Sequence, residues 1–336
     1  DSSTGWMNPW VLGGIIGGLV LLVAFVFIEL HTASPMFNMR LFKIRAFAMA
    51  NLAGLLASVG RGGLQFMLII WLQGIWLPLH GFAYADTPLW AGIYMLPITI
   101  GFLIAGPLSG TLSDRFGARA FATIGLLLVA ATFVMLLVIP VNFQYWQFAI
   151  ITFLSGIGSG MFGAPNRTAI MNSVPANERG SASGMAGTVQ NAGTSLSIGV
   201  FFSLLIAGLS TSLPATLTNG LTAHGVPAAI AHEIGALPPV GSVFAAFLGY
   251  NPIKSLLAPT GALDHISHAN VAILTGKDFF PQLISQPFHD GLTVVFIAAA
   301  IMSVIGAIAS LSRGKKYMHE DEPEPLVAPL SESRVR

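Results

Sequence analysis

The sequence predicts an all-α membrane protein with about seven transmembrane helices. Of its 336 residues, 54% are hydrophobic and only 9% are charged, whereas soluble domains carry about 25% charged residues. The mean hydropathy is +0.75. A soluble protein of this composition would expose far too much apolar surface, so lipid must surround most of the chain. Helices are expected because a helix satisfies each backbone N–H and C=O within its own segment.

Each predicted span is an apolar stretch of roughly 20 residues or more, which is long enough to cross a bilayer. The chain begins at Asp1 without a Met, so we expect a fragment whose natural N-terminus lies upstream. The first span is too long to be the apolar part of a cleaved signal peptide. The spans cover residues 10–30, 46–72, 89–110, 120–140, 147–170, 185–208 and 291–311.

Basic residues gather on one side of this arrangement. If the first span runs from outside to inside, the inner loops and the tail hold most of the 15 Lys and Arg residues. Short loops rich in Lys and Arg stay in the cytoplasm. We therefore expect a multi-pass protein of the plasma (inner) membrane with a cytoplasmic C-terminus. The inner-loop residues are Arg40, Lys43, Arg45, Arg115, Arg119, Arg167 and Arg179.

Residues 1–45 are predicted to form a transmembrane helix followed by an inner connector, and the family resemblance described below implies that this helix is a linker. The connector, 34–42, fits a short amphipathic helix with Met36 and Phe42 toward lipid, and it fits a plain linker equally well. Tryptophans flank the predicted outer ends of several spans, and we expect their amphipathic rings at headgroup depth. They are Trp6, Trp10, Trp71, Trp76, Trp90 and Trp146.

The second span holds Arg61 near its middle and Gln65 one turn later. A cation at bilayer depth costs a few kcal/mol or more, so Arg61 should face a wet cavity or a carboxylate. The alternative is a displaced span, with Arg61 reaching an interface. Apolar residues continue well past Arg61 on both sides, which favours the cavity. The glycines at 60, 62 and 63 predict close approach of another helix or a local break.

A short polar link at 106–119 joins the third and fourth spans and lies at the basic side. Glycines at two of its positions permit a tight turn and close helix approach. Asp114 is placed to accept hydrogen bonds from the start of a helix. An ordinary basic turn would need neither the aspartate nor both glycines. The motif consists of Gly110, Leu112, Asp114, Arg115, Gly117 and Arg119.

This motif, lying between two spans, closely resembles the loop signature of the major facilitator superfamily. With residues 89–97 and 156–199, the resemblance is strongest to the C-terminal half of a fourteen-helix multidrug drug/proton antiporter. It implies that the first span is one of two extra helices and that 46–312 is a six-helix bundle. The missing N-terminal half of the same transporter would be its partner, and the motif would act as a cytoplasmic gating latch.

The fifth and sixth spans carry small and polar residues. Gly156, Gly158 and Gly160 predict a close helix contact rather than a hinge. Gln190 and Asn191 are polar at membrane depth. They either hydrogen-bond across helices as structural glue or line a substrate path, and the sequence leaves both open.

The outer loop, 209–290, is too long for a simple turn. Short helices are expected at 228–237 and 252–257, with breaks at Pro238, Gly249 and Pro287. Three histidines have only loose metal-ligand character, so solvated loop histidines are favoured and no metal is expected. They are His265, His268 and His289. The tail, 313–336, is charged and rich in proline, which predicts a disordered cytoplasmic segment.

The resemblance implies proton-coupled efflux of small amphiphilic drugs by alternating access. Candidate cavity residues are Arg61, Gln65, Gln190 and Asn191. No Asp or Glu lies in a span core, so this half alone should not couple protons. There is no phosphate loop or nucleophile elbow, so neither enzyme activity nor a cofactor is expected. The net charge of +1 argues against nucleic acid.

Two other functions stay open. The long apolar outer loop would suit an exporter of an envelope lipid or another large amphiphile. A non-transporting membrane structural or interaction protein would use its buried polar residues for packing alone.

Overall fold

The computed structural model describes residues 8–32 and 35–314. All regular structure in these residues is helical, and seven helical stretches are long and apolar enough to cross a membrane. The predicted fold class is thereby confirmed. The main helices are α1 (Pro9–His31), α2 (Arg45–Trp71), α5 (Leu96–Phe116), α6 (Ala118–Val138), α7 (Tyr145–Asn172), α8 (Arg179–Ala223) and α13 (Phe279–Leu311).

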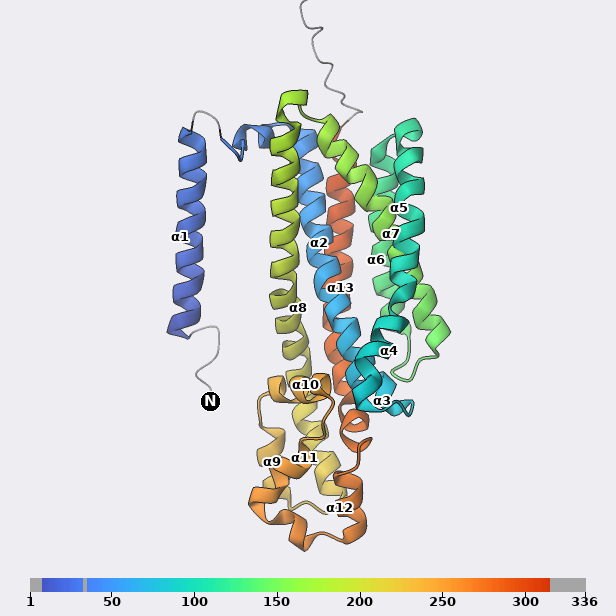
Figure 1. The fold of residues 1–336 in the computed structure, drawn as a ribbon. Helices are drawn as coiled ribbons and strands as arrows, with labels where there is room; N and C mark the ends of the chain where they lie inside the picture. The colour runs from blue at the N-terminus through green and yellow to red at the C-terminus, as the bar shows by residue number, and fades with distance from the viewer. Residues whose placement is uncertain (1–7, 33–34, 315–336) are drawn as a thin grey trace, which may run out of the picture.

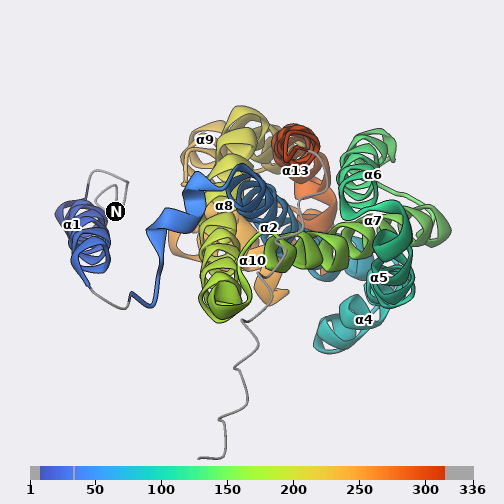
Figure 2. The same ribbon diagram turned by 90° about the horizontal axis from the view of Figure 1, so that it is seen from above.

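Helix α1 stands apart from the other helices (Figures 1 and 2). It begins after Asn8, whose side chain accepts a hydrogen bond from the Trp10 amide at 2.9 Å, and none of its residues is buried. A 3₁₀ helix, η2 (Met39–Lys43), leads from α1 to the bundle. Leu41 of η2 is buried with Phe47 of α2, which fastens the connector to the bundle.

The bundle consists of two groups of three helices. Helices α2, α8 and α13 pack together, and α5 and α6 both pack on α7. Contacts of α13 with α6, and of α2 with α7, join the groups. In Figure 2, α2 and α7 lie in the middle, with α8 and α5 flanking them on either side. Such paired three-helix groups provide an interface near the bilayer midplane where a binding site can form.

Glycines let α5, α6 and α7 touch backbone to backbone. A Cβ built on Gly156 would lie 2.0 Å from the Ile98 carbonyl oxygen of α5. A Cβ on Gly158 would lie 2.7 Å from the Gly125 carbonyl oxygen of α6. The structure thus confirms the predicted close contact of this small-residue stretch.

The predicted outer loop, 209–290, is mostly helix, which corrects its boundaries. Helix α8 continues to Ala223 and α13 starts at Phe279, with Pro287 inside it rather than at a break. Buried leucines four residues apart explain the extension of α8, because they form one apolar stripe; they are Leu209, Leu213, Leu217 and Leu221.

Four short helices form a cap on this end of the bundle, at the bottom of Figure 1. Among them, α9 and α10 meet at an angle of 82°. We call this end the capped end. The opposite end, with η2, the α5–α6 turn and the end of α13, is the basic end. The cap helices are α9 (Ala228–Gly235), α10 (Pro239–Leu248), α11 (Ile253–Leu257) and α12 (His268–Leu274).

Two tryptophans expected at the membrane interface lie in the core instead. Trp71 is fully buried, and Trp76 is nearly so. The reason is that the span of α2 continues through a π-helical turn, η3 (Leu72–Trp76), to Leu79 beneath the cap. The Trp76 indole stacks on Phe143 and donates to its carbonyl oxygen at 3.1 Å. Trp10 and Trp146 are exposed, as an interfacial position requires, and Trp6 lies outside the described residues.

Candidate substrate cavity and gating motif

A cavity of about 360 Å³ lies between the two three-helix groups. Its wall combines apolar side chains from α5, α6 and α7 with polar side chains from α2, α7, α8 and α13. A mostly apolar cavity with a few convergent polar groups is the usual form of a small-molecule site. Its polar lining residues are Ser58, Arg61, Ser159, Asn166, Arg167, Gln190 and Ser303.

Arg61 lies in the wall of this cavity, near the middle of α2. Its guanidinium carbon is 6.0 Å from the centre of the Phe102 ring of α5, within range of a cation–π attraction. Gln190 of α8 lines the same cavity. A Cβ on Gly54 would come within 3.4 Å of the Asn166 amide nitrogen and 3.8 Å of the Gln190 amide nitrogen. The missing side chain at this glycine therefore leaves these two amides room.

Next to Arg61, helix α8 is pressed into the backbone of α2. The Ser197 hydroxyl accepts a hydrogen bond from the Gly63 amide and donates one to the Val59 carbonyl. An ordinary α-helix would pair these two backbone groups with each other. A Cβ on Gly62 would lie 3.0 Å from the Thr194 methyl group. The glycines at 62 and 63 thus serve the close helix approach expected from the sequence.

Two of the four sequence-predicted cavity residues lie elsewhere. Gln65 and Asn191 are exposed and do not belong to the described lining of the cavity. The structure brings together Arg61 and Gln190 only. Gln65 shares a helix face with Arg61 but lies about 6 Å further along the α2 axis. Adjacent residues of a helix, such as Gln190 and Asn191, face different directions.

Asn166, Arg167 and Ser303 line the cavity but were not predicted to do so. Arg167 was expected in an inner loop, whereas α7 continues to Asn172. A signal was present in the sequence, because Ser159, Gly163 and Arg167 recur every four residues and so share one face of a helix.

The polar link at 106–119 is almost entirely helical, which corrects its interpretation as a loop. Helix α5 runs to Phe116, and α6 starts at Ala118. Asp114 therefore belongs to the last turn of α5, not to the start of a helix. The turn itself is Gly117, whose φ of 90° favours glycine. Gly110 is not tightly packed, because its Cβ would meet Ala164 only at 3.7 Å.

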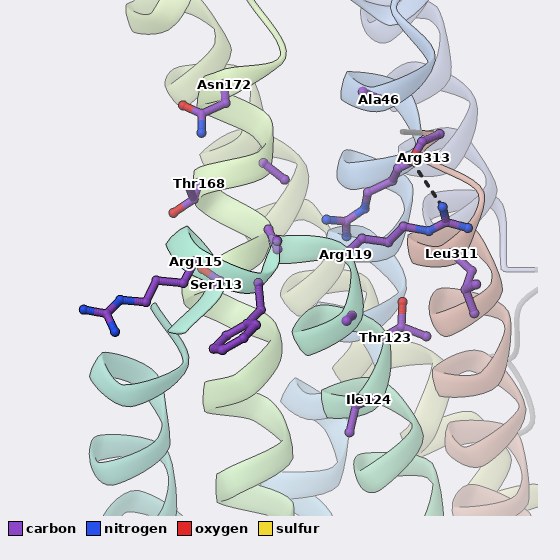
Figure 3. Close-up of a pocket in the computed structure, with 16 residues that line it drawn as sticks. Ala46, Ser113, Arg115, Arg119, Thr123, Ile124, Thr168, Asn172, Leu311 and Arg313 are labelled. Atoms are coloured by element: carbon purple, nitrogen blue, oxygen red, sulfur yellow. Dashed lines mark hydrogen bonds between the residues drawn. The ribbon is translucent and has the colours of Figure 1, made fainter. Parts of the chain in front are cut away.

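Beside this turn, a pocket of about 750 Å³ opens at the basic end. We call it the basic-end pocket. It is lined from the α5–α6 turn and from the ends of α2, α7 and α13, as Figure 3 shows. Arg119 donates to the Gly314 carbonyl oxygen at 3.3 Å. The polar side chains that line the basic-end pocket are those of Ser113, Arg115, Arg119, Thr123, Thr168, Asn172 and Arg313.

Arg313 also lines the basic-end pocket and is only 6% exposed. It was expected in a disordered tail, yet it packs directly after α13, while residues 315–336 lie outside the described part of the chain. Its Nη2 donates to the Asn166 Oδ1, and Asn166 donates to the Ala50 carbonyl oxygen at 3.3 Å. Burial lowers the pKa of Arg313 to about 10. Asn166 thus connects the cavity wall with the basic-end pocket.

The histidines of the outer segment do not gather into a metal site. His289 bonds the Ile139 carbonyl oxygen at 3.2 Å, away from the cap helix that starts at His268. Within residues 8–32 and 35–314, no group of three or more His, Cys, Asp or Glu side chains is placed to hold a metal ion.

The sequence profile of the Major Facilitator Superfamily matches residues 2–198, more than half of the chain. The chain belongs to the Major Facilitator Superfamily. The match includes the second through fifth spans, both cavity residues Arg61 and Gln190, and the motif at the α5–α6 turn. With seven apolar helices among its described residues, this superfamily member is a multi-pass integral membrane protein.

Curated relatives of this superfamily member include transporters and resistance proteins. The MFS-type transporter YhcA of Bacillus subtilis is 33% identical over 58% of this chain and 36% of its own length. The methyl viologen resistance protein SmvA of Salmonella typhimurium is 29% identical over 66% and 43%. The tetracenomycin C resistance and export protein of Streptomyces glaucescens is 23% identical over 97% and 55%. The chain thus spans between about a third and just over half the length of these relatives.

Proposed function

We propose that this chain forms the C-terminal six-helix bundle of a proton-coupled exporter of small amphiphilic molecules in the cell membrane. It would work by alternating access against a second bundle. Two relatives are named for resistance to or export of small organic compounds, and the chain spans 43% and 55% of them. Helix α1 would be a linker helix between the bundles, in agreement with its position outside the bundle.

The observation that carries the proposal is the cavity between the three-helix groups. Arg61 and Gln190 would donate hydrogen bonds to polar groups of the substrate, while Phe102 would cover an apolar ring. A charged side chain at membrane depth is costly, so its presence there favours a functional role. No carboxylate is among the described residues that line the cavity, so the proton would be carried by the second bundle.

The motif at the basic end would act as the latch. Arg119 on α6 and Gly314 after α13 join two helices that belong to different three-helix groups. Movement of one three-helix group against the other would break or form this bond. The Asn166–Arg313 hydrogen bond would couple the same movement to the cavity wall.

The test is an export assay of the complete protein in cells that lack their own exporters. The test compounds are methyl viologen, for which the Salmonella relative is named, and a panel of amphiphilic molecules. Intracellular accumulation is measured with and without a protonophore. We expect lower accumulation that the protonophore abolishes. Arg61→Gln should weaken export roughly tenfold, because one hydrogen bond from a charged group is lost.

Matched controls come from the two polar residues outside the cavity. Gln65→Leu and Asn191→Leu should leave export unchanged, while Gln190→Leu should impair it. If no compound accumulates less in expressing cells, the exporter proposal is wrong. If all four substitutions are harmless to transport, these side chains serve packing alone.

A second candidate is an exporter of an envelope lipid or another large amphiphile. The observation that favours it is an exposed apolar surface on the cap, where Leu248 is 66% exposed and Phe244 and Tyr250 are each 49% exposed. Deleting the cap would uncover the part of α8 against which α9 packs, so substitution is the better test. Leu248→Ser with Phe244→Ser should abolish lipid export if this surface receives an acyl chain. Unchanged drug export with no lipid phenotype would exclude it.

A further inference from the structure

We infer that the basic-end pocket binds the headgroup of an anionic phospholipid. Arg119 and Arg313 would hold the phosphate, and the acyl chains would lie along the apolar rim. This inference rests on the pocket itself and does not depend on the proposed transport function.

Among the described residues, the positive charge that lines the pocket has no acidic partner. Arg313 is buried, and its Nε and Nη1 have no hydrogen-bond partner within the described residues. Within the part of the chain that the structure describes, Arg119 has one hydrogen-bond partner, the Gly314 carbonyl oxygen, which it contacts through Nη1. No carboxylate is among the described side chains that line the pocket. A buried guanidinium with unsatisfied donors is costly, so a ligand that supplies acceptor oxygens would stabilise this arrangement.

The donor set fits a phosphate. In Figure 3, the Arg119 and Arg313 side chains extend in opposite directions, and Arg115 lies toward the other side of the pocket. Thr168 and Asn172 of α7 add neutral polar groups to the same lining. Arginine presents several N–H groups in a planar fork, which matches phosphate oxygens. Arg115 would contribute only long-range attraction.

The apolar rim argues for a lipid rather than a free anion. Phe116, Ile124 and Leu311 line the pocket and are 72%, 53% and 47% exposed. They stand at the ends of helices that cross the membrane, at the depth where headgroups and acyl chains meet. Clustered cations beside apolar surface suit an amphiphile with an anionic head.

The test uses the purified full chain in lipid nanodiscs of phosphatidylcholine with or without phosphatidylglycerol. Native mass spectrometry counts the lipids that stay bound, and thermal unfolding reports their effect. We expect selective retention of phosphatidylglycerol, weakened roughly fivefold for each arginine removed. The variants are Arg119→Gln and Arg313→Gln. Arg40→Gln is the matched control, because it removes an exposed positive charge at the same end outside the pocket.

Should Arg313→Gln not fold, the exposed Arg119 alone decides the test. Equal retention of both lipids by the unaltered chain, or equal loss in the Arg40→Gln control, would overturn the inference. Inorganic phosphate added to phosphatidylcholine discs gives a separate arm. If phosphate stabilises the protein and phosphatidylglycerol does not, the pocket binds a free anion and the lipid inference is wrong.

The acidic residues 320–324 of the same chain are the competing occupant. A chain shortened after Gly314 tests them directly. If it binds phosphatidylglycerol selectively and the full chain does not, the chain's own tail fills the pocket and the lipid inference fails. Equal selectivity of both chains would support it.

Discussion

At the scale of single residues, Asn166 links three helices of the bundle through its side-chain amide. Its amide donates to α2 at Ala50 and accepts from Arg313 after α13, although it belongs to α7. A buried amide with both ends satisfied costs little, whereas a buried arginine that loses its partner costs a great deal. The sequence shows an asparagine near a helix end and gives no sign of either bond.

We therefore expect Asn166→Ala to destabilise the protein by roughly 2 kcal/mol or more, because Arg313 is left buried without its acceptor. Thermal unfolding of the purified chain measures the change. Asn172→Ala is the control. Asn172 lines the basic-end pocket on the same helix, and its side chain makes no hydrogen bond to the described residues. Equal destabilisation by both substitutions would show that the Arg313 bond contributes nothing.

At the scale of elements, helix α7 is held against its neighbours by glycines rather than by interlocking large side chains. Gly101, Gly156 and Gly160 bring the backbones of α5 and α7 together, while Gly125 and Gly158 do so for α6 and α7. Association in lipid depends on such close packing, because apolar side chains gain nothing by leaving water there. The three helices α5, α6 and α7 should consequently move as one unit.

Gly156→Ala tests this packing. The new methyl group would lie 2.0 Å from the Ile98 carbonyl oxygen, so α5 and α7 must separate. We expect a loss of roughly 1–3 kcal/mol, as overpacking usually costs. Gly163→Ala, on the same helix, meets nothing closer than a Phe102 ring carbon at 3.8 Å. A thermal unfolding midpoint for Gly163→Ala that falls as far as that for Gly156→Ala would refute the packing argument.

At the scale of the whole molecule, the two ends differ in their content of positive charge. The basic end carries the arginines of η2, of the α5–α6 turn and of the end of α13, whereas Lys254 and Lys277 are the described lysines near the cap. The positive-inside bias therefore predicts a cytoplasmic basic end and a cap on the outside. That orientation would set the latch and the basic-end pocket against the inner leaflet, where anionic lipids are found.

Cysteine labelling tests this orientation cleanly, because the chain has no cysteine of its own. Ser255→Cys places a thiol at an exposed position of the cap, and Asn177→Cys places one at the basic end. An impermeant maleimide should label Ser255→Cys in intact cells and Asn177→Cys only after permeabilisation. The opposite pattern would invert the topology and remove the cytoplasmic role of the latch.

The sequence by itself determined that lipid surrounds most of the chain, that the fold is all-helical, and approximately where each span lies. Mean hydropathy over a bilayer-length window depends only on the local composition, so a long apolar stretch can be identified as a membrane span without knowledge of its contacts. It also located Arg61 as a costly intramembrane cation, and it identified the loop motif, whose chemistry is local. Only the tertiary structure decided which polar groups share a cavity, because Gln65 and Gln190 look equally suitable until the neighbours of each side chain are known. It also decided that α8 and α13 extend into the cap, that Trp71 is buried, and that Arg313 is hydrogen-bonded to Asn166. Those outcomes depend on contacts between segments far apart in the chain, which composition and periodicity do not record.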